Sequence, residues 1–232
     1  MNLYKDLILL DKEKHKDLKL SLSGDLFFAK SLPAIPLLIN EIALVGNTFP
    51  IVFTADKEPG LVALVSINNK NVAINAEGKW IAKYVPAYLK KYPFALATTE
   101  KDSLNRVVLI DEESPLFSDT GVPLFEENGE SSKILVNIID FLSSYEQTMQ
   151  VTKETAAIIS QSGILEDREI SIGEGKEKRV LIKGFKVVNK EKLHDLSDEV
   201  LAEWVRKGII TLIDIHLKSL ENIQLLFSLA KQ

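Results

Sequence analysis

The C-terminal half of this sequence contains one extended stretch, Arg179-Val-Leu-Ile-Lys-Gly-Phe-Lys-Val-Val188, between segments of helical periodicity. Its β-branched residues favour a strand. The preceding residues, Gly173-Glu-Gly-Lys-Glu-Lys178, have the composition of a turn, so we predict a hairpin near 171–188. If this hairpin adds its strands to a sheet built by the first half of the chain, the two halves form one α+β domain.

The first half of the chain, up to about residue 128, is predicted to be rich in strands. Polar and apolar residues alternate along Asp17-Leu-Lys-Leu-Ser-Leu22, which is typical of a strand with one buried face. Asp56-Lys-Glu-Pro-Gly60 has turn composition, and we predict a hairpin that joins strands near 51–54 and 61–67. Apolar runs predict two further strands near 94–97 and 106–110. One helix is expected at about 36–45, with Pro36 in its first turn.

From residue 129 to residue 232 the periodicity is mainly helical. Apolar side chains recur every three or four residues from Ile134 to Met149, which predicts a helix, and a shorter helix is expected at 152–162. Ser197 is a favourable N-cap for a helix through Arg206. A last helix is expected at about 209–230. We therefore predict a single α+β domain over 1–232, with a largely antiparallel sheet from the N-terminal half and C-terminal helices packed on it.

Composition excludes several classes of protein. The chain has 232 residues, of which 46% are hydrophobic and 26% charged, so it can bury a core without disulfide or metal staples. It has no cysteine, which excludes disulfides, thiolate zinc sites, iron–sulfur clusters and cysteine nucleophiles. The formal net charge is -5, and a broad nucleic-acid-binding surface is therefore not expected. We expect no cofactor, no bound metal and no nucleic-acid partner.

The chain also carries no recognisable targeting or membrane signal. Only four apolar residues, Leu7 to Leu10, precede a charged run, which does not match a secretory signal peptide. The apolar stretch 208–213 ends at Asp214, far short of the roughly 20 residues needed to span a bilayer. We expect a cytoplasmic protein without a membrane span. The alternative is export to the cell surface without a signal peptide.

The most distinctive chemistry lies in the segment 79–93, where aromatic and basic residues alternate. Prolines 86 and 93 bracket a short helical turn, and the tyrosines are four residues apart, so they share one face if the helix reaches both ends. Tyrosine and tryptophan side chains can stack on a sugar or bind a peptide. The alternative is that the rings belong to the core, as aromatic side chains often do. The proposed binding residues are Trp80, Lys83, Tyr84, Tyr88, Lys90 and Tyr92.

The segment Trp80-Ile-Ala-Lys-Tyr-Val-Pro-Ala-Tyr-Leu-Lys-Lys-Tyr-Pro-Phe94 resembles the signature of the SapC family of bacterial proteins. Other stretches agree in the expected order, and together they cover nearly the whole chain: Phe49-Pro-Ile-Val-Phe53, Ile110-Asp-Glu-Glu-Ser-Pro115, Leu124-Phe-Glu-Glu-Asn-Gly-Glu130, Lys192-Leu-His-Asp-Leu-Ser-Asp-Glu-Val-Leu201, Gly208-Ile209 and His216-Leu-Lys-Ser-Leu-Glu-Asn222. The family is associated by name with surface-layer (S-layer) proteins. The resemblance implies no reaction and no catalytic residues.

Two further groups of residues are candidates for chemistry. Nine carboxylates lie between residues 100 and 130, where they can bind a divalent cation or a basic partner, or form a solvated loop. The three histidines, His15, His194 and His216, have no metal-ligand spacing, and His216 is expected to be buried and hydrogen-bonded. Gly173-Glu-Gly-Lys176 lacks the spacing of a phosphate-binding loop.

These observations favour a non-catalytic protein that binds a protein or surface-polymer partner in the biogenesis of bacterial surface proteins. The alternative is an enzyme that modifies a peptide or glycan through Asp111 or Glu113 with His194 or His216, brought together only by the fold. A third possibility is an exported S-layer subunit. The sequence predicts neither the ligand nor the oligomeric state.

Overall fold

The computed structural model describes residues 3–67, 70–98, 106–173 and 177–230. Within it the chain divides into two compact units. Unit 1 comprises Met1–Lys30, Ile74–Trp80 and Ala87–Gln147, and unit 2 comprises Ser31–Ala73, Ile81–Pro86 and Thr148–Gln232. Each unit takes segments from both halves of the sequence, so the change of periodicity near 128 is not a boundary between them. The single domain over 1–232 stays a prediction.

Unit 1 is built on a three-stranded antiparallel sheet of order β1-β9-β8. Strands β1 (Leu7–Leu9), β8 (Phe94–Thr98) and β9 (Arg106–Asp111) pair with Ile8 opposite Ile110, and Ile110 opposite Phe94. Smaller elements complete the unit: β2 (Lys19–Leu20), the 3-10 turn η1 (Phe27–Ala29), α2 (Ala87–Lys90) and β10 (Val122–Pro123), which pairs with β2.

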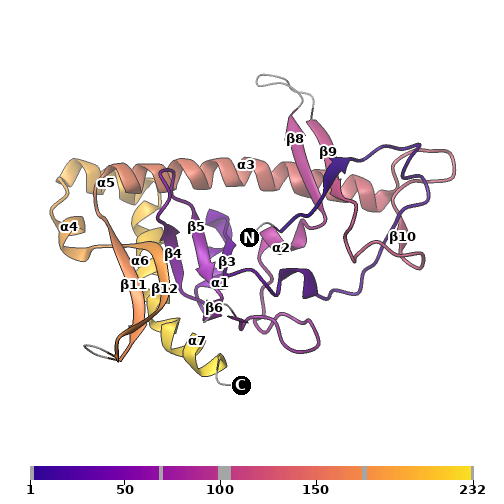
Figure 1. The fold of residues 1–232 in the computed structure, drawn as a ribbon. Helices are drawn as coiled ribbons and strands as arrows, with labels where there is room; N and C mark the ends of the chain where they lie inside the picture. The colour runs from indigo at the N-terminus through magenta and orange to yellow at the C-terminus, as the bar shows by residue number, and fades with distance from the viewer. Residues whose placement is uncertain (1–2, 68–69, 99–105, 174–176, 231–232) are drawn as a thin grey trace. The chain divides into compact units, whose positions relative to one another are not determined.

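The core of unit 1 forms where helix α3 (Lys133–Gln161) packs on this sheet. Leu135 and Leu142 of the helix share one buried cluster with Phe94 and Ile110 of the strands. The alternation of side chains along a strand explains the arrangement, since Ile8, Ile110 and Phe94 all point to the same face. Helix α3 is continuous through Gln161 (Figure 1), so the prediction of two helices at 134–149 and 152–162 is wrong.

Unit 2 is built on a five-stranded antiparallel sheet of order β11-β12-β4-β5-β3. Its strands are β3 (Ala34–Pro36), β4 (Ile51–Thr54), β5 (Leu61–Leu64), β11 (Leu165–Ile172) and β12 (Arg179–Val188). Figure 1 shows the β11–β12 hairpin beside β4. The two predicted hairpins are therefore confirmed, and the late one does join strands of the first half. It begins at Leu165, earlier than expected, and turn residues 174–176 lie outside the described residues.

Unit 2 also contains several helices, of which α6 (Ile209–Ser219) packs against β4 and β12. These helices are α1 (Ile42–Val45), α4 (Lys190–His194), α5 (Asp198–Arg206), α6 (Ile209–Ser219) and α7 (Ile223–Leu229). The unit also contains the 3-10 turns η2 (Ile39–Glu41) and η4 (Leu220–Asn222). Two short strands, β6 (Ser66–Ile67) and β7 (Lys70–Asn71), pair with each other. Ser197 caps α5 as predicted, because its hydroxyl accepts the N–H of Val200. The α+β class is confirmed.

Three predicted elements differ in extent. The helix expected at 36–45 is α-helical only from Ile42, because Pro36 belongs to β3 and a 3-10 turn follows. The helix expected at 209–230 is interrupted by η4. The strand expected at 17–22 is reduced to β2. No helix in the described part of the chain has both the length and the hydropathy that crossing a bilayer requires.

Candidate functional site

The predicted aromatic–basic site does not form a single helical face. Helix α2 contains only Ala87–Lys90, so it includes Tyr88 but reaches neither Tyr84 nor Tyr92. The segment is also shared between the two units, since residues 81–86 belong to unit 2 and the residues on either side belong to unit 1. A spacing of four residues therefore does not align the three tyrosines here.

Tyr84 serves a buried carboxylate of unit 2. Its hydroxyl donates a hydrogen bond to Glu41 Oε2 at 2.9 Å, and Glu41 is only 1% exposed. The second oxygen, Oε1, accepts the backbone N–H of Leu38 at 2.9 Å. Burial, with the hydrogen bond to Glu41, raises the pKa of Tyr84 to about 12. Buried carboxylates require hydrogen-bond donors, so this hydroxyl has a structural task.

Tyr92 lies in the core of unit 1. It is 6% exposed, its ring stacks on Phe28 with centroids 4.2 Å apart, and its hydroxyl donates to Asp111 Oδ2 at 3.0 Å. Asp111 is fully buried and also accepts the backbone N–H groups of Lys5 and Asp6. Tyr92 is one of the predicted binding residues, but its ring is buried in unit 1, because the ring and hydroxyl together fill the interior around Asp111 and satisfy its carboxylate.

Tyr88 contributes to a cluster around a lysine that the sequence analysis did not select. The ammonium of Lys91 lies over the rings of Tyr4, Tyr88 and Tyr145, at 5.4, 5.5 and 4.8 Å from their centroids. Burial lowers the pKa of Lys91, and the charge of Glu146 opposes this shift. Such cation–π contacts stabilise a partly desolvated ammonium. Tyr88 of α2 and Lys91, which directly follows the helix, thus contact each other within unit 1.

The remaining members of the predicted site are accessible to different degrees. Lys83 and Lys90 are exposed, while Trp80 is half-buried and forms an antiparallel bridge with Ile74 in unit 1. The side chains of these two lysines are therefore accessible at the surface. The rings are mainly engaged within their own units.

His216 behaves as predicted. It is 1% exposed, its Nε2 accepts the backbone N–H of Val188 at 3.1 Å, and its Nδ1 lies 2.7 Å from the carbonyl oxygen of Ile51. Because Nε2 accepts, the proton resides on Nδ1 and is donated to Ile51. Burial lowers the pKa of His216 to about 4. The neutral ring therefore ties α6 to β4 and β12.

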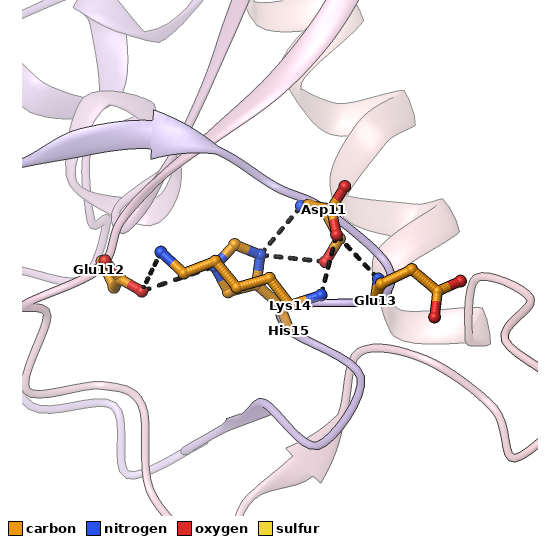
Figure 2. A network of polar contacts seen from close by, with 5 residues as sticks. All are labelled: Asp11, Glu13, Lys14, His15 and Glu112. Atoms are coloured by element: carbon orange, nitrogen blue, oxygen red, sulfur yellow. Dashed lines mark hydrogen bonds and ion pairs between the residues drawn. The ribbon is translucent and has the colours of Figure 1, made fainter.

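A second histidine forms a polar network that the sequence did not reveal. Figure 2 shows His15 between Asp11 and Glu112. The imidazole is buried; Nδ1 lies 2.9 Å from the backbone nitrogen of Asp11, and Nε2 lies 3.6 Å from Glu112 Oε1. The same carboxylate oxygen pairs with Lys14 at 2.8 Å, and this contact lowers the pKa of Glu112.

This network connects the turn at residues 11–15 to Glu112, the residue that directly follows strand β9. The carboxylate of Asp11 accepts the backbone N–H groups of Glu13 and Lys14, which lowers its pKa and closes the turn that carries His15. The 3.6 Å separation between His15 and Glu112 is longer than a hydrogen bond. Only the fold brings these residues together, since 97 positions separate them, and no sequence motif signals the pair.

The residues of the rival catalytic hypothesis are distributed between the units. Asp111 and the exposed Glu113 belong to unit 1, whereas His194 and His216 belong to unit 2. His194 is exposed and lines a groove of about 430 Å³ with Asp214, Lys218 and Glu221. This groove joins a histidine and two carboxylates, but it uses acids other than those predicted.

The acidic segment 100–130 is mostly solvated where the structure describes it. Asp111 is buried and Glu112 is paired, while Glu113, Asp119, Glu126, Glu127 and Glu130 are exposed. Glu100 and Asp102 lie outside the described residues. Over the described ranges, no three histidine or acidic side chains are grouped so that they can hold a metal ion.

A cavity in unit 2 adjoins strand β12. It has a volume of about 620 Å³, and apolar side chains of β3, β5 and β12 form much of its wall, including Ala34, Leu64 and Ile182. Polar groups at its border include Thr54, Glu169 and Lys183. Cavities of about 300–1,000 Å³ with mainly apolar walls and a few polar groups are typical ligand sites. No sequence motif indicates this cavity, because its walls come from segments more than a hundred residues apart.

Comparison with known proteins agrees with the family resemblance. A family model described as SapC matches residues 10–226, nearly the whole chain. No curated protein and no solved structure matches.

Proposed function

Because this chain belongs to the SapC family, we propose that it is a non-catalytic accessory protein that binds a protein or surface-polymer partner. The role we propose is in the biogenesis of bacterial surface proteins, in line with the family's association with S-layers. The proposed location is the cytoplasm, and fractionation of host cells separates this from location at the surface.

One observation carries the proposal: the cavity of unit 2 that β12 borders. Its walls combine apolar side chains with polar groups, and Lys183 and Glu169 supply charge at its border. By contrast, the buried ionisable groups Glu41 and His216 are engaged within unit 2. Glu41 accepts from Leu38 and Tyr84, and His216 joins Ile51 to Val188. This arrangement supports binding rather than chemistry, because catalytic groups need to reach a substrate.

The test is affinity capture from the native host, followed by mass spectrometry. Ala34→Phe places a ring in the cavity from strand β3, and we expect it to abolish capture of the partner seen with the wild-type chain. The matched control is Val205→Phe, because Val205 is 64% exposed on α5 in the same unit and does not line the cavity. Equal capture by both variants, with both folded by circular dichroism, contradicts binding at this site.

The contact surface predicted from the sequence is retained for its exposed cations, Lys83 and Lys90. Because the two lysines belong to different units, they are tested separately, as Lys83→Glu and Lys90→Glu. Each substitution should leave the free energy of unfolding within about 0.5 kcal/mol of wild type, as surface changes usually do. Capture unaffected by both substitutions removes this segment from the proposal.

A second candidate function is catalysis at the groove of His194. It is favoured by the presence of Asp214 and Glu221 at the same groove, since a histidine beside carboxylates can act as a general base. Turnover of peptide or glycan substrates that is lost in His194→Ala and retained in the exposed-surface variant Val205→Phe would favour this function over the binding one.

A further inference from the structure

Strand β12 has an edge that its neighbour β4 leaves open. Along one side β12 pairs with β11 from Arg179 to Val188, but along the other side it pairs with β4 only at Phe185 and Lys186. One additional bond joins the N–H of Ala55 to the carbonyl of Gly184. Over the described residues, the stretch 180–183 therefore has no strand partner on the side away from β11.

The lengths of the strands explain this open edge. Strand β4 ends at Thr54, and the chain then turns toward β5, so β4 is too short to follow β12 further. Gly184 has a left-handed φ of +80°, which only glycine adopts readily and which redirects β12 at the same point. The four residues 180–183 extend over about 13 Å at roughly 3.3 Å per residue.

The open edge borders the cavity described above. The cavity is lined by every residue from Val180 to Phe185 on one side, and by Val62 and Leu64 on the other. Val62, Leu64 and Thr54 share one face of the sheet, because side chains two residues apart or directly opposite point the same way. An edge strand offers backbone donors and acceptors to a further strand, and the facing apolar side chains offer pockets for its side chains.

Charge at the border selects among possible occupants. Glu169 is already paired with Lys178, with Nζ and Oε1 2.6 Å apart. Lys183 lines the cavity and is exposed, and it has no ion-pair partner within the described parts of the chain. A carboxylate on the occupant would complement this lysine.

We propose that this cavity binds an extended segment of a partner protein, with β-branched apolar residues and one acidic side chain, as an added strand on β12. The inference rests on the proposed binding function and names its ligand class. Backbone hydrogen bonds to 180–183 provide the pairing, Val62 and Leu64 receive the apolar side chains, and Lys183 pairs with the acid.

The test uses a fluorescent capped hexapeptide, Thr-Val-Asp-Val-Thr-Val, and two controls that carry lysine in place of aspartate or proline in place of the central valine. Fluorescence polarisation with the full chain should show binding of the first peptide. The proline peptide should bind at least tenfold more weakly, because proline lacks the N–H that a strand ladder requires. Amide hydrogen exchange should slow at 180–183 when the first peptide binds.

The variants Lys183→Gln and Lys183→Glu test the charge. We expect a loss of affinity for the aspartate peptide of about threefold for Lys183→Gln, since an exposed ion pair contributes little, and about tenfold for Lys183→Glu, which adds repulsion. Lys183→Glu should bind the lysine peptide better than the wild type does. Lys190→Glu, outside the cavity, is the matched control and should leave both affinities unchanged.

The outcomes separate this inference from the proposed function. If Ala34→Phe abolishes capture from the host while none of the peptides binds, the strand-addition inference is wrong and the binding function stands. The opposite result is that the aspartate peptide binds and protects the amides of 180–183, while Ala34→Phe does not change capture from the host. In that case the strand-addition inference is supported and the proposed function at this cavity is wrong. If the same amides are protected without peptide in a dimer detected by light scattering, the occupant is a second copy and the peptide inference is wrong.

Discussion

The substitution Tyr92→Phe should destabilise unit 1, although it removes only one oxygen atom. Asp111 is fully buried and has three described donors: the backbone N–H groups of Lys5 and Asp6, at 3.1 and 3.0 Å, and the hydroxyl of Tyr92, also at 3.0 Å. Removing the hydroxyl leaves a buried carboxylate oxygen with one donor fewer. Hydrogen bonds to such groups contribute about 1.5–3 kcal/mol, so we expect a loss of about 2 kcal/mol in the free energy of unfolding.

Tyr88→Phe is the matched control for this prediction. Tyr88 lies in the same unit, and in the described part of the chain its hydroxyl has no hydrogen-bond partner. The chain has two tryptophans, Trp80 in unit 1 and Trp204 in unit 2, so urea unfolding followed by fluorescence in a Trp204→Phe background reports on unit 1. Equal unfolding free energies for Tyr92→Phe and Tyr88→Phe in that background would refute the role given to the hydroxyl.

Other predictions concern buried and paired charges. Burial lowers the pKa of His216 from 6.5 to about 4, so between these pH values the unfolded chain binds a proton that the folded chain does not. The free energy of unfolding should therefore fall by about 3 kcal/mol as the pH drops from 6.5 to 4. In urea titrations across pH, His216→Gln should reduce this dependence of the free energy of unfolding on pH. Lys91→Met removes the cation enclosed by three tyrosine rings and should cost about 1–2 kcal/mol by chemical denaturation, whereas Lys83→Met on the exposed surface should cost less than about 0.5 kcal/mol. Glu112→Gln should lower the melting temperature slightly at low salt and not at high salt, because salt screens the solvent-exposed pair of Glu112 with Lys14. A change in melting temperature that does not depend on salt would contradict this prediction.

Short-range rules predicted the elements whose signals are local. The turn at Asp56–Gly60, the cap at Ser197 and the hairpin that contains Arg179–Val188 depend on residues close in sequence, and each is present. The prediction failed inside α3, where Val151 and Thr152 are β-branched and disfavour helix slightly. There the hydroxyl of Thr152 donates to the carbonyl of Thr148 and accepts the N–H of Ile39, so tertiary contacts keep the helix intact.

The candidate site shows the same limit at longer range. Spacing alone placed Tyr84, Tyr88 and Tyr92 on one face, but each hydroxyl or ring is directed by a partner elsewhere in the chain. Glu41 is 43 residues from Tyr84, and Asp111 is 19 residues from Tyr92. Neither carboxylate belongs to a motif that marks it as buried. The sequence therefore identified residues with unusual surroundings but could not tell interior partners from external ones.

The structure favours the backbone of β12, rather than the tyrosine side chains of the aromatic–basic segment, as the proposed binding site. The tyrosines of the aromatic–basic segment already satisfy Glu41, Asp111 and the Lys91 ammonium, so using their polar groups for a partner would first break these contacts. The edge of β12 needs no such exchange, since no strand covers 180–183 on the side of the cavity in the described residues. The open edge follows from the point where β4 ends, and residue types do not show that point, which explains why the motifs indicated the rings and not the edge.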